Sequence, residues 1–287
     1  VDGLEVRRGG CAANIVYGMG VLGLNPVLIA AVGKDWADYD AWLLRHGVDT
    51  SHVLISTTQF TAHFMVTTDT ELNQIASFFP GAMSEARNIE LGSIMDKTGR
   101  FDIVVISPDD PEAMLRHSEV CRSQGIAFAA DPSQQMARMS GEEIRQLITG
   151  AKYLFLNEYE LALAMQKTGW TDAEILDLVE YRVVTLGSKG AKVESKHGEF
   201  VQVGVPKEKA KIDPTGVGDA FRAGFLTGLG WGLSPQRCAE VGSLLATYVI
   251  ETIGTQEYIL DKAEFISRLE AAYGSECAQD VASHLGK

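Results

Sequence analysis

The sequence has few cysteines, and none of them has the spacing of a metal site or a disulfide framework. Its four cysteines are widely separated with no CxxC pair, and its six histidines include no HExxH. Scattered cysteines favour a reducing, cytoplasmic setting. The sequence therefore indicates neither a disulfide-stabilised secreted protein nor a transition-metal enzyme.

Positive charge and long apolar runs are also scarce. The 287 residues include 25 Lys and Arg against 38 Asp and Glu, a net charge of −13, which argues against binding to nucleic acids or anionic membranes. Apolar runs such as residues 27–32 are far shorter than the ~20 residues of a membrane span. The chain starts at Val1 with no signal pattern, so we expect this start to be the edge of a longer chain.

Short apolar runs alternate with helical segments over most of the length. Capping boxes begin helices at Ser140 and Thr171, Asp110 precedes a proline as an N-cap, and Gly47 ends a helix around residues 36–46. The strand candidates are residues 27–32, 101–107, 126–130, 153–156 and 181–186. This alternation predicts an α/β fold with a mostly parallel sheet and helices on both faces, and no long linker in residues 1–287 demands a second independent domain.

Residues 57–79 break this alternation, because they have no helical period. Two strand-like runs flank a polar turn at residues 69–71, which predicts a β-hairpin. We expect the hairpin to stand apart from the α/β layers as a lid.

A glycine-rich loop, DPTGVGDAF at residues 213–221, is the most informative segment. Pro214 disfavours helix before it, and helix formers follow Asp219, so the loop leads into a helix N-terminus. Backbone amides there can converge on a phosphate, and a carboxylate at that place can accept a proton from a hydroxyl nucleophile. The alternative is a plain glycine-rich turn in which Asp219 only caps the helix.

Three other segments place small or polar residues where ligands bind in α/β proteins. Residues 9–14 open a helix with small side chains, or else allow tight helix packing. Residues 157–160 follow a strand and lie at the carboxyl edge of the sheet, or else form a capped helix start. Residues 185–190 follow another strand and either cradle phosphate oxygens or form a hairpin turn.

These four segments, in this order, resemble the ribokinase-like (PfkB) family of carbohydrate and nucleoside kinases from about Arg8 onward. Within the family the sequence is most similar to the actinobacterial adenosine kinases, on residues 52–56, 74–89, 128–135 and 215–228. The resemblance implies a three-layer α/β/α sandwich with a small β lid built from about residues 1–8 and 57–79. It also implies ATP-dependent phosphorylation of adenosine at the 5′-hydroxyl, which gives AMP and ADP in purine salvage.

The resemblance also implies roles for individual residues. Asp219 is implied as the base, and the anion hole is implied to include Gly216, Val217 and Gly218. Asn157 and Glu160 match positions that place magnesium, largely through water. The nucleotide-binding positions are Asn157, Thr185, Gly187 and Gly190.

On the acceptor side, Gly10 and Asn14 match residues that hold sugar hydroxyls. The nucleoside is implied to lie among Phe64, Phe78, Gln134, Gln135 and Arg138, with Phe64 completing a pocket across subunits. An aromatic face and amide edges are what a purine requires. In the alternative, the two phenylalanines pack the hairpin and Arg138 lies on the surface.

Three further expectations follow from the resemblance. Potassium activation is common in the family, and residues 252–256 with the backbone near Asp213 are the candidate site. The apolar hairpin predicts a homodimer through the lid. The family's opening strand, with an aspartate that binds the sugar hydroxyls, is expected to be missing here, which predicts weakened substrate binding. A ribokinase-type or fructokinase-type sugar kinase and a catalytically impaired nucleoside-binding protein remain alternatives.

Overall fold

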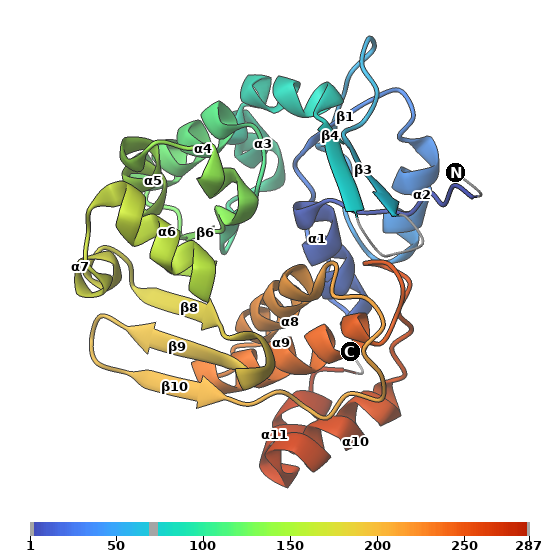
Figure 1. Cartoon of the computed structure of the whole chain (residues 1–287), viewed down its shortest axis with the longest axis vertical. Helices are drawn as coiled ribbons and strands as arrows, with labels where there is room; N and C mark the ends of the chain where they lie inside the picture. Colours follow the sequence, from blue (N-terminus) through green and yellow to red (C-terminus); the bar gives the residue numbers. More distant parts are fainter. Residues whose placement is uncertain (1–2, 69–73, 286–287) are drawn as a thin grey trace.

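The centre of the protein is a six-stranded sheet, seen in a computed structural model that describes residues 3–68 and 74–285 (Figure 1). Its strand order is β10-β9-β8-β7-β6-β5. The strands are β5 (Val104–Ile106), β6 (Phe128–Ala130), β7 (Tyr153–Asn157), β8 (Tyr181–Thr185), β9 (Ala191–Ser195) and β10 (Phe200–Val203). Strands β5 to β8 are parallel, and β9 and β10 are antiparallel additions. The prediction of a mostly parallel sheet is confirmed.

Helices cover both faces of this sheet, because its strands alternate their side chains between two apolar clusters. In β7, Leu154 and Leu156 belong to one cluster and Tyr153 and Phe155 to the other. The first cluster includes residues of α3 (Leu91–Thr98), α4 (Pro111–Ser123), α5 (Gly141–Ile148), α6 (Glu158–Thr168) and α7 (Asp172–Asp177). The second includes residues of α1 (Cys11–Val21), α2 (Ala37–Arg45), α8 (Val217–Gly230), α9 (Pro235–Ile250), α10 (Lys262–Tyr273) and α11 (Ser275–Ala282).

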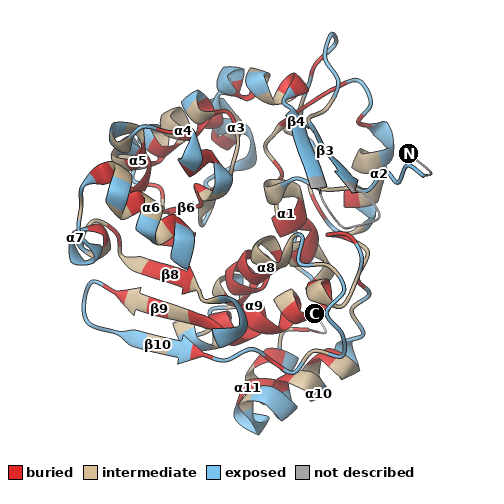
Figure 2. Ribbon diagram, in the orientation of Figure 1, coloured by how far each residue is buried: buried red, intermediate tan, exposed pale blue. Residues whose placement is uncertain are grey.

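Helix α8 is deeply packed, and buried residues line much of α8 and α9 in Figure 2. Small residues let its neighbours approach closely. A Cβ on Gly224 of α8 would lie 2.7 Å from the Cα of Gly242 in α9. A Cβ on Gly18 of α1 would lie 2.7 Å from the Cβ of Ala223. Helix α8 is therefore held between α1 and α9 almost backbone to backbone.

The helix starts agree with the sequence signals. Ser140 and Thr171 form the predicted capping boxes, and Asp110 accepts a hydrogen bond from the amide of Ala113 at the start of α4. Gly47 follows α2 with φ = 79°, in the left-handed region that a C-terminal cap requires.

One predicted strand is much shorter than expected. Of residues 27–32, only β1 (Ala31–Val32) is a strand, and it pairs in parallel with β2 (Leu54–Ile55) in a separate two-stranded sheet. An isolated bridge joins Val27 to Asp49. The segment thus has a hydrogen-bonding partner on one side and only at intervals, which interrupts the ladder. Similarly, the prediction for 101–107 reduces to β5.

The predicted hairpin is present as β3 (His63–Thr68) and β4 (Gln74–Phe79), which pair with each other in a sheet of their own. It projects away from the α/β layers in Figure 1, and the predicted turn at 69–71 lies outside the described residues. Residues 3–10 have no helix or strand. Phe64 and Phe78 face each other across the hairpin, and 67% and 41% of their surfaces are exposed.

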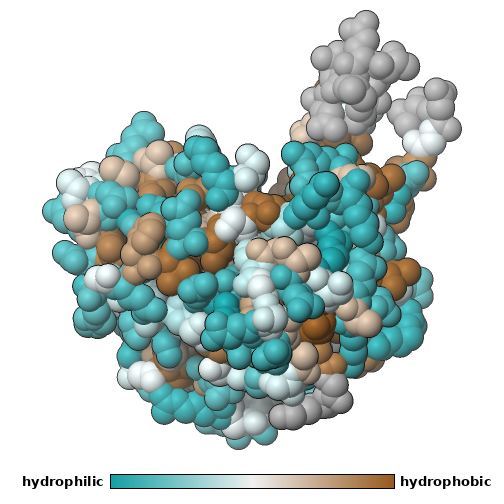
Figure 3. Space-filling model, turned by 90° about the horizontal axis from the view of Figure 1, so that it is seen from below, coloured by the Kyte–Doolittle hydropathy of each residue, from teal (hydrophilic) through white to brown (hydrophobic). Residues whose placement is uncertain are grey.

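One face of the molecule is mainly hydrophilic (Figure 3). Figure 3 shows a face on which hydrophobic residues are scattered among hydrophilic ones. Within the described residues, no helix combines the length and the apolar character that crossing a membrane requires.

Candidate active site

The glycine-rich loop leads into α8 as the sequence predicted. Gly216 caps the helix with φ = 78°, and a Cβ at this position would lie 2.6 Å from Cγ2 of Thr255. Both the backbone angle and the lack of space therefore require glycine. Asp219 lies in the first turn of α8, next to amides that have no partner within the helix. The loop thus combines an anion-binding backbone with a carboxylate.

Asn14 of α1 joins this carboxylate. Its Nδ2 donates a hydrogen bond of 2.8 Å to Oδ2 of Asp219, and only 6% of the Asn14 surface is exposed. Two segments some 200 residues apart in the sequence therefore meet at one site. Burial raises the pKa of Asp219 above its usual range, although the Asn14 hydrogen bond and the nearby Arg222 guanidinium act in the opposite direction.

A buried ion pair lies directly beneath the loop. Nη2 of Arg222, one turn after Asp219, is 2.6 Å from Oδ1 of Asp131, which follows β6. A Cβ on Gly218 would lie 2.9 Å from Nη1 of Arg222, so the guanidinium packs against the loop backbone. The charges touch without a well-aligned hydrogen bond, so both oxygens of Asp131 lack a hydrogen-bond partner within the described chain. Burial raises the pKa of Asp131 to about 7.

Asn157 and Glu160 form a capping box at the start of α6. Oδ1 of Asn157 accepts from the amide of Glu160, and Oε2 of Glu160 accepts from the amide of Asn157, both at 2.8 Å. The capped helix start, left open by the sequence, is therefore present. A magnesium role is compatible with it, because a cap occupies only one carboxylate oxygen of Glu160.

The surrounding charges suit a hard cation. Glu160 raises the pKa of both Asp131 and Asp219, so three carboxylates act on the region around the Arg222 guanidinium. Magnesium prefers such oxygen ligands and keeps several waters. In the described ranges, no three His, Cys, Asp or Glu side chains converge closely enough to enclose a metal. The donor set therefore fits a cation held partly by water or phosphate.

The segment 185–190 connects β8 to β9 as a hairpin turn, the alternative that the sequence left open. Thr185 ends β8 directly beside Asn157, its partner in the parallel register. Gly187 is exposed in the left-handed region (φ = 57°), and Gly190, with φ = 93°, packs against the backbone of Val203. The structure thus brings the predicted nucleotide-binding residues to one edge of the sheet.

The residues expected around a nucleoside are only partly gathered. The amide of Gln134, in the short helix η2 (Ser133–Ala137), is 3.5 Å from Sγ of Cys11 at the start of α1. Gln135 is buried and donates to the backbone carbonyl of Asp109 at 2.8 Å. Arg138 is exposed. Gln134 therefore borders the site, whereas the Gln135 amide nitrogen already has a partner.

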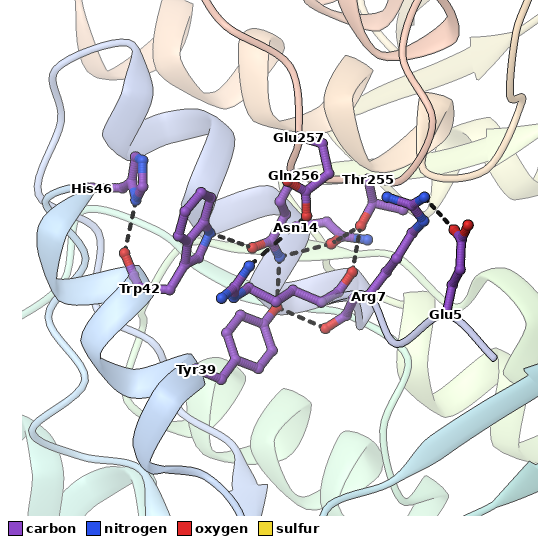
Figure 4. Close-up of polar contacts among 11 residues, drawn as sticks. Glu5, Arg7, Asn14, Tyr39, Trp42, His46, Thr255, Gln256 and Glu257 are labelled. Atoms are coloured by element: carbon purple, nitrogen blue, oxygen red, sulfur yellow. Dashed lines mark hydrogen bonds and ion pairs between the residues drawn. The ribbon is translucent and has the colours of Figure 1, made fainter.

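Several residues of the site were not expected from the sequence. Asp131 and Arg222 pair across distant segments, and a lone arginine in the apolar run that follows Asp219 was the available signal. Thr255 and Gln256 hydrogen-bond to Oδ1 of Asn14 at 2.8 and 2.9 Å (Figure 4). Their segment was expected only as a candidate potassium site, not as a partner of Asn14.

Known proteins share this architecture. The model of a family described as pfkB family carbohydrate kinase matches residues 1–263. A nucleoside kinase of Methanocaldococcus jannaschii is 29% identical over 264 residues, which are 91% of this chain and 85% of that protein. The structure of Burkholderia thailandensis nucleoside kinase in complex with inosine aligns with a TM-score of 0.89 and 32% identity, over 96% of this chain and 91% of that one. Cryptococcus neoformans ribokinase in complex with ADP shares the fold (TM-score 0.78, 20% identity, 93% and 90% coverage).

Proposed function

Because the chain belongs to the PfkB family of carbohydrate kinases and has the ribokinase-like fold, we propose that it is an ATP-dependent adenosine kinase acting on the 5′-hydroxyl. The general reaction is phosphoryl transfer to an alcohol group of a nucleoside or sugar. The family and the nucleoside kinase relatives share this reaction. The observation that carries the proposal is Asp219, held by Asn14 at 2.8 Å in the first turn of α8 beside the loop amides.

In the proposed reaction, Asp219 accepts the proton of the 5′-hydroxyl as its oxygen bonds to the γ-phosphorus of ATP. The bond from that phosphorus to the β,γ-bridging oxygen breaks, so ADP leaves with the electron pair. Charge develops on the transferred phosphoryl group beside the amides of Gly216, Val217 and Gly218. Such transfer depends mainly on positioning and on electrostatic stabilisation.

Magnesium, when bound, neutralises charge on the β- and γ-phosphates. Glu160 and Asn157 would hold it through water at the start of α6, beside Thr185. The nucleotide would thus lie over the β7–β8 edge, with Gly187 and Gly190 in the turn beyond it. The α8 amides would then lie between the nucleotide and the acceptor.

Two observations support a nucleoside as the acceptor. The similar protein from Burkholderia thailandensis has been captured with inosine, and relatives from two archaea are nucleoside kinases. In this chain, Phe64 and Phe78 expose an aromatic pair on the hairpin, and Gln134 contributes an amide beside α1. Adenosine, rather than another purine nucleoside, is proposed from the adenosine kinase resemblance.

The potassium site and the lid-mediated homodimer also remain predictions. In support of the cation site, the amide of Gly254 donates to Oδ2 of Asp213 at 3.1 Å, so the two candidate segments lie together. In support of the dimer, the hairpin exposes Phe64, Met65 and Ile75.

The function is tested by an acceptor screen. Adenosine, inosine, ribose and fructose are each incubated with ATP and magnesium, ADP release is followed, and ³¹P NMR identifies the product. We expect the highest kcat/KM with adenosine and 5′-AMP as the product. Turnover of ribose or fructose without adenosine would replace the proposal with a sugar kinase. Adenosine binding without ADP release would indicate a binding protein.

Glu160→Gln separates the capping role from the magnesium role. Glutamine keeps an oxygen that accepts from the amide of Asn157, so we expect an unchanged melting temperature. The lost charge should raise the magnesium concentration for half-maximal activity by about 10–100-fold. This is the loss of metal affinity typical when a residue that contacts a metal through water or another ligand is replaced. A titration of activity with magnesium measures this. Glu158→Gln, at an exposed position of the same first turn, is the matched control.

A further inference from the structure

We infer that Gln256 is a positioning residue, which fixes the Asn14 side-chain amide in the orientation that presents an N–H to Asp219. Gln256 is buried, and the sequence singled out its segment only as a candidate potassium site. Its amide connects aromatic residues of α2 to the amide that contacts the base (Figure 4). This inference rests on the proposed function, because it assigns Asp219 the role of the base.

The orientation starts from a group that can only donate. The indole Nε1 of Trp42 lies 3.1 Å from Gln256, so Gln256 must present its oxygen there. The hydroxyl of Tyr39 donates to the carbonyl of Gly9 at 2.8 Å and therefore accepts from Nε2 of Gln256 at 2.5 Å. Two independent partners thus set the same rotation of the Gln256 amide.

This rotation determines the next one. Nε2 of Gln256 also points at Asn14, at 2.9 Å, so Asn14 must present Oδ1 to it. The hydroxyl of Thr255 lies 2.8 Å from the same oxygen and can also donate to it. With Oδ1 engaged, Nδ2 of Asn14 faces Asp219 and donates at 2.8 Å. In the reversed orientation, Asn14 would oppose a donor with a donor and a carboxylate with an oxygen.

The consequence reaches the chemistry. An N–H aimed at Asp219 favours its ionised form, and only that form can accept the proton of a hydroxyl. It also fixes Oδ2, leaving the other carboxylate oxygen for the acceptor. The relay, defined as Trp42, Tyr39, Gln256 and Asn14, therefore sets both the charge state and the direction of the base.

The relay also contacts the chain that precedes α1. The guanidinium of Arg8 lies 4.2 Å from the centre of the Trp42 ring, and the carbonyl of Gly9 accepts from Tyr39. The carbonyl of Arg8 is 3.0 Å from the hydroxyl of Thr255, which can donate either to it or to Asn14. Gly9 is thus connected to the base through a continuous set of hydrogen bonds that passes through the relay.

Two substitutions of Gln256 distinguish polarity from packing. Gln256→Glu reverses the polarity, because a carboxylate facing Asn14 drives its amide to turn. Gln256→Met keeps the approximate shape of the side chain and removes its polar atoms. The hydroxyl of Thr255 can still donate to Oδ1 of Asn14 in this variant. We expect Gln256→Glu to lower kcat by about 10–100-fold, the effect of losing a hydrogen bond to a charged group, and Gln256→Met by much less. The low-pH limb of the kcat/KM profile should move to higher pH in Gln256→Glu alone.

A second readout needs no activity. The side-chain ¹⁵N–¹H signals of Asn14 should follow the titration of Asp219 in the unliganded wild type and in Gln256→Met, but not in Gln256→Glu. The charged groups that also act on Asp219 are Arg222 of α8, Asp131 after β6 and Glu160 of α6, and the Cys11 thiol of α1 lies near it. All are present in each variant.

Equal losses of kcat in the two variants, with Asn14 signals that follow Asp219 in both, would overturn the relay. If the wild type shows no kinase activity, the proposed function fails, and the NMR titration still decides the relay.

Discussion

Asp219→Asn is expected to lower kcat by at least about 100-fold, the lower range for a lost general base. Asparagine has the size of aspartate, and its oxygen can still accept from Nδ2 of Asn14, so the first turn of α8 should be unchanged. It cannot take the proton of the 5′-hydroxyl. A coupled assay of ADP release at saturating adenosine and ATP measures the loss.

The pH profile gives this prediction a sign. Burial raises the pKa of Asp219, so wild-type kcat/KM should fall as the pH drops through that raised value. The residual activity of Asp219→Asn should lack this limb. Calorimetric affinity for adenosine and the melting temperature serve as controls. A near-wild-type rate would remove Asp219 from the mechanism.

Arg222→Met is expected to lower the free energy of unfolding more than the other substitutions do. It leaves Asp131 buried without a counter-charge, a situation that typically costs about 3–5 kcal/mol of unfolding free energy. Urea denaturation at pH 8 measures the effect. The double variant Arg222→Met with Asp131→Asn removes both charges, and we expect it to recover at least half of the loss.

The cost should depend on pH. Burial raises the pKa of Asp131 to about 7, and loss of the guanidinium raises it further. Above pH 7, Asp131 in the folded variant still holds a proton that it releases in the unfolded chain. The free energy of unfolding of the variant therefore falls as the pH rises from 7 toward the higher pKa of Asp131. The gap between wild type and Arg222→Met should therefore be small near pH 6 and widen above pH 7. A pH-independent gap would show that lost packing, not charge, is the cause.

Local signals predicted the fold well, since they act within a few residues. The capping boxes at Ser140 and Thr171 and the loop into α8 are where the sequence predicted them, and the capped start at Asn157, one of two alternatives, is also present. Strand length was harder to predict, because it depends on partners elsewhere in the chain. Residues 27–32 have the composition of a full buried strand, yet only Ala31 and Val32 form one.

The site divides along the same line. Asp219 and the glycines of its loop were predicted because one motif contains them. The roles of Asp131 and Gln256 near Asp219 were not predicted, because each acts through a partner on a different element. The sequence at Asn157–Glu160 is compatible with both a helix cap and a cation site. Only the cap could be predicted from neighbouring residues, because a cation site also depends on groups from other elements.

The close glycine contact between α8 and α9 determines which part of the protein can adapt to a substrate. A helix whose backbone contacts its neighbours has few alternative positions of similar energy. Helix α8 therefore holds Asp219 in a fixed position. The hairpin, paired only with itself, forms the opposite extreme. Any adaptation to the size of an acceptor is therefore expected in the hairpin, so substrate range can drift during evolution while the chemical step stays constant.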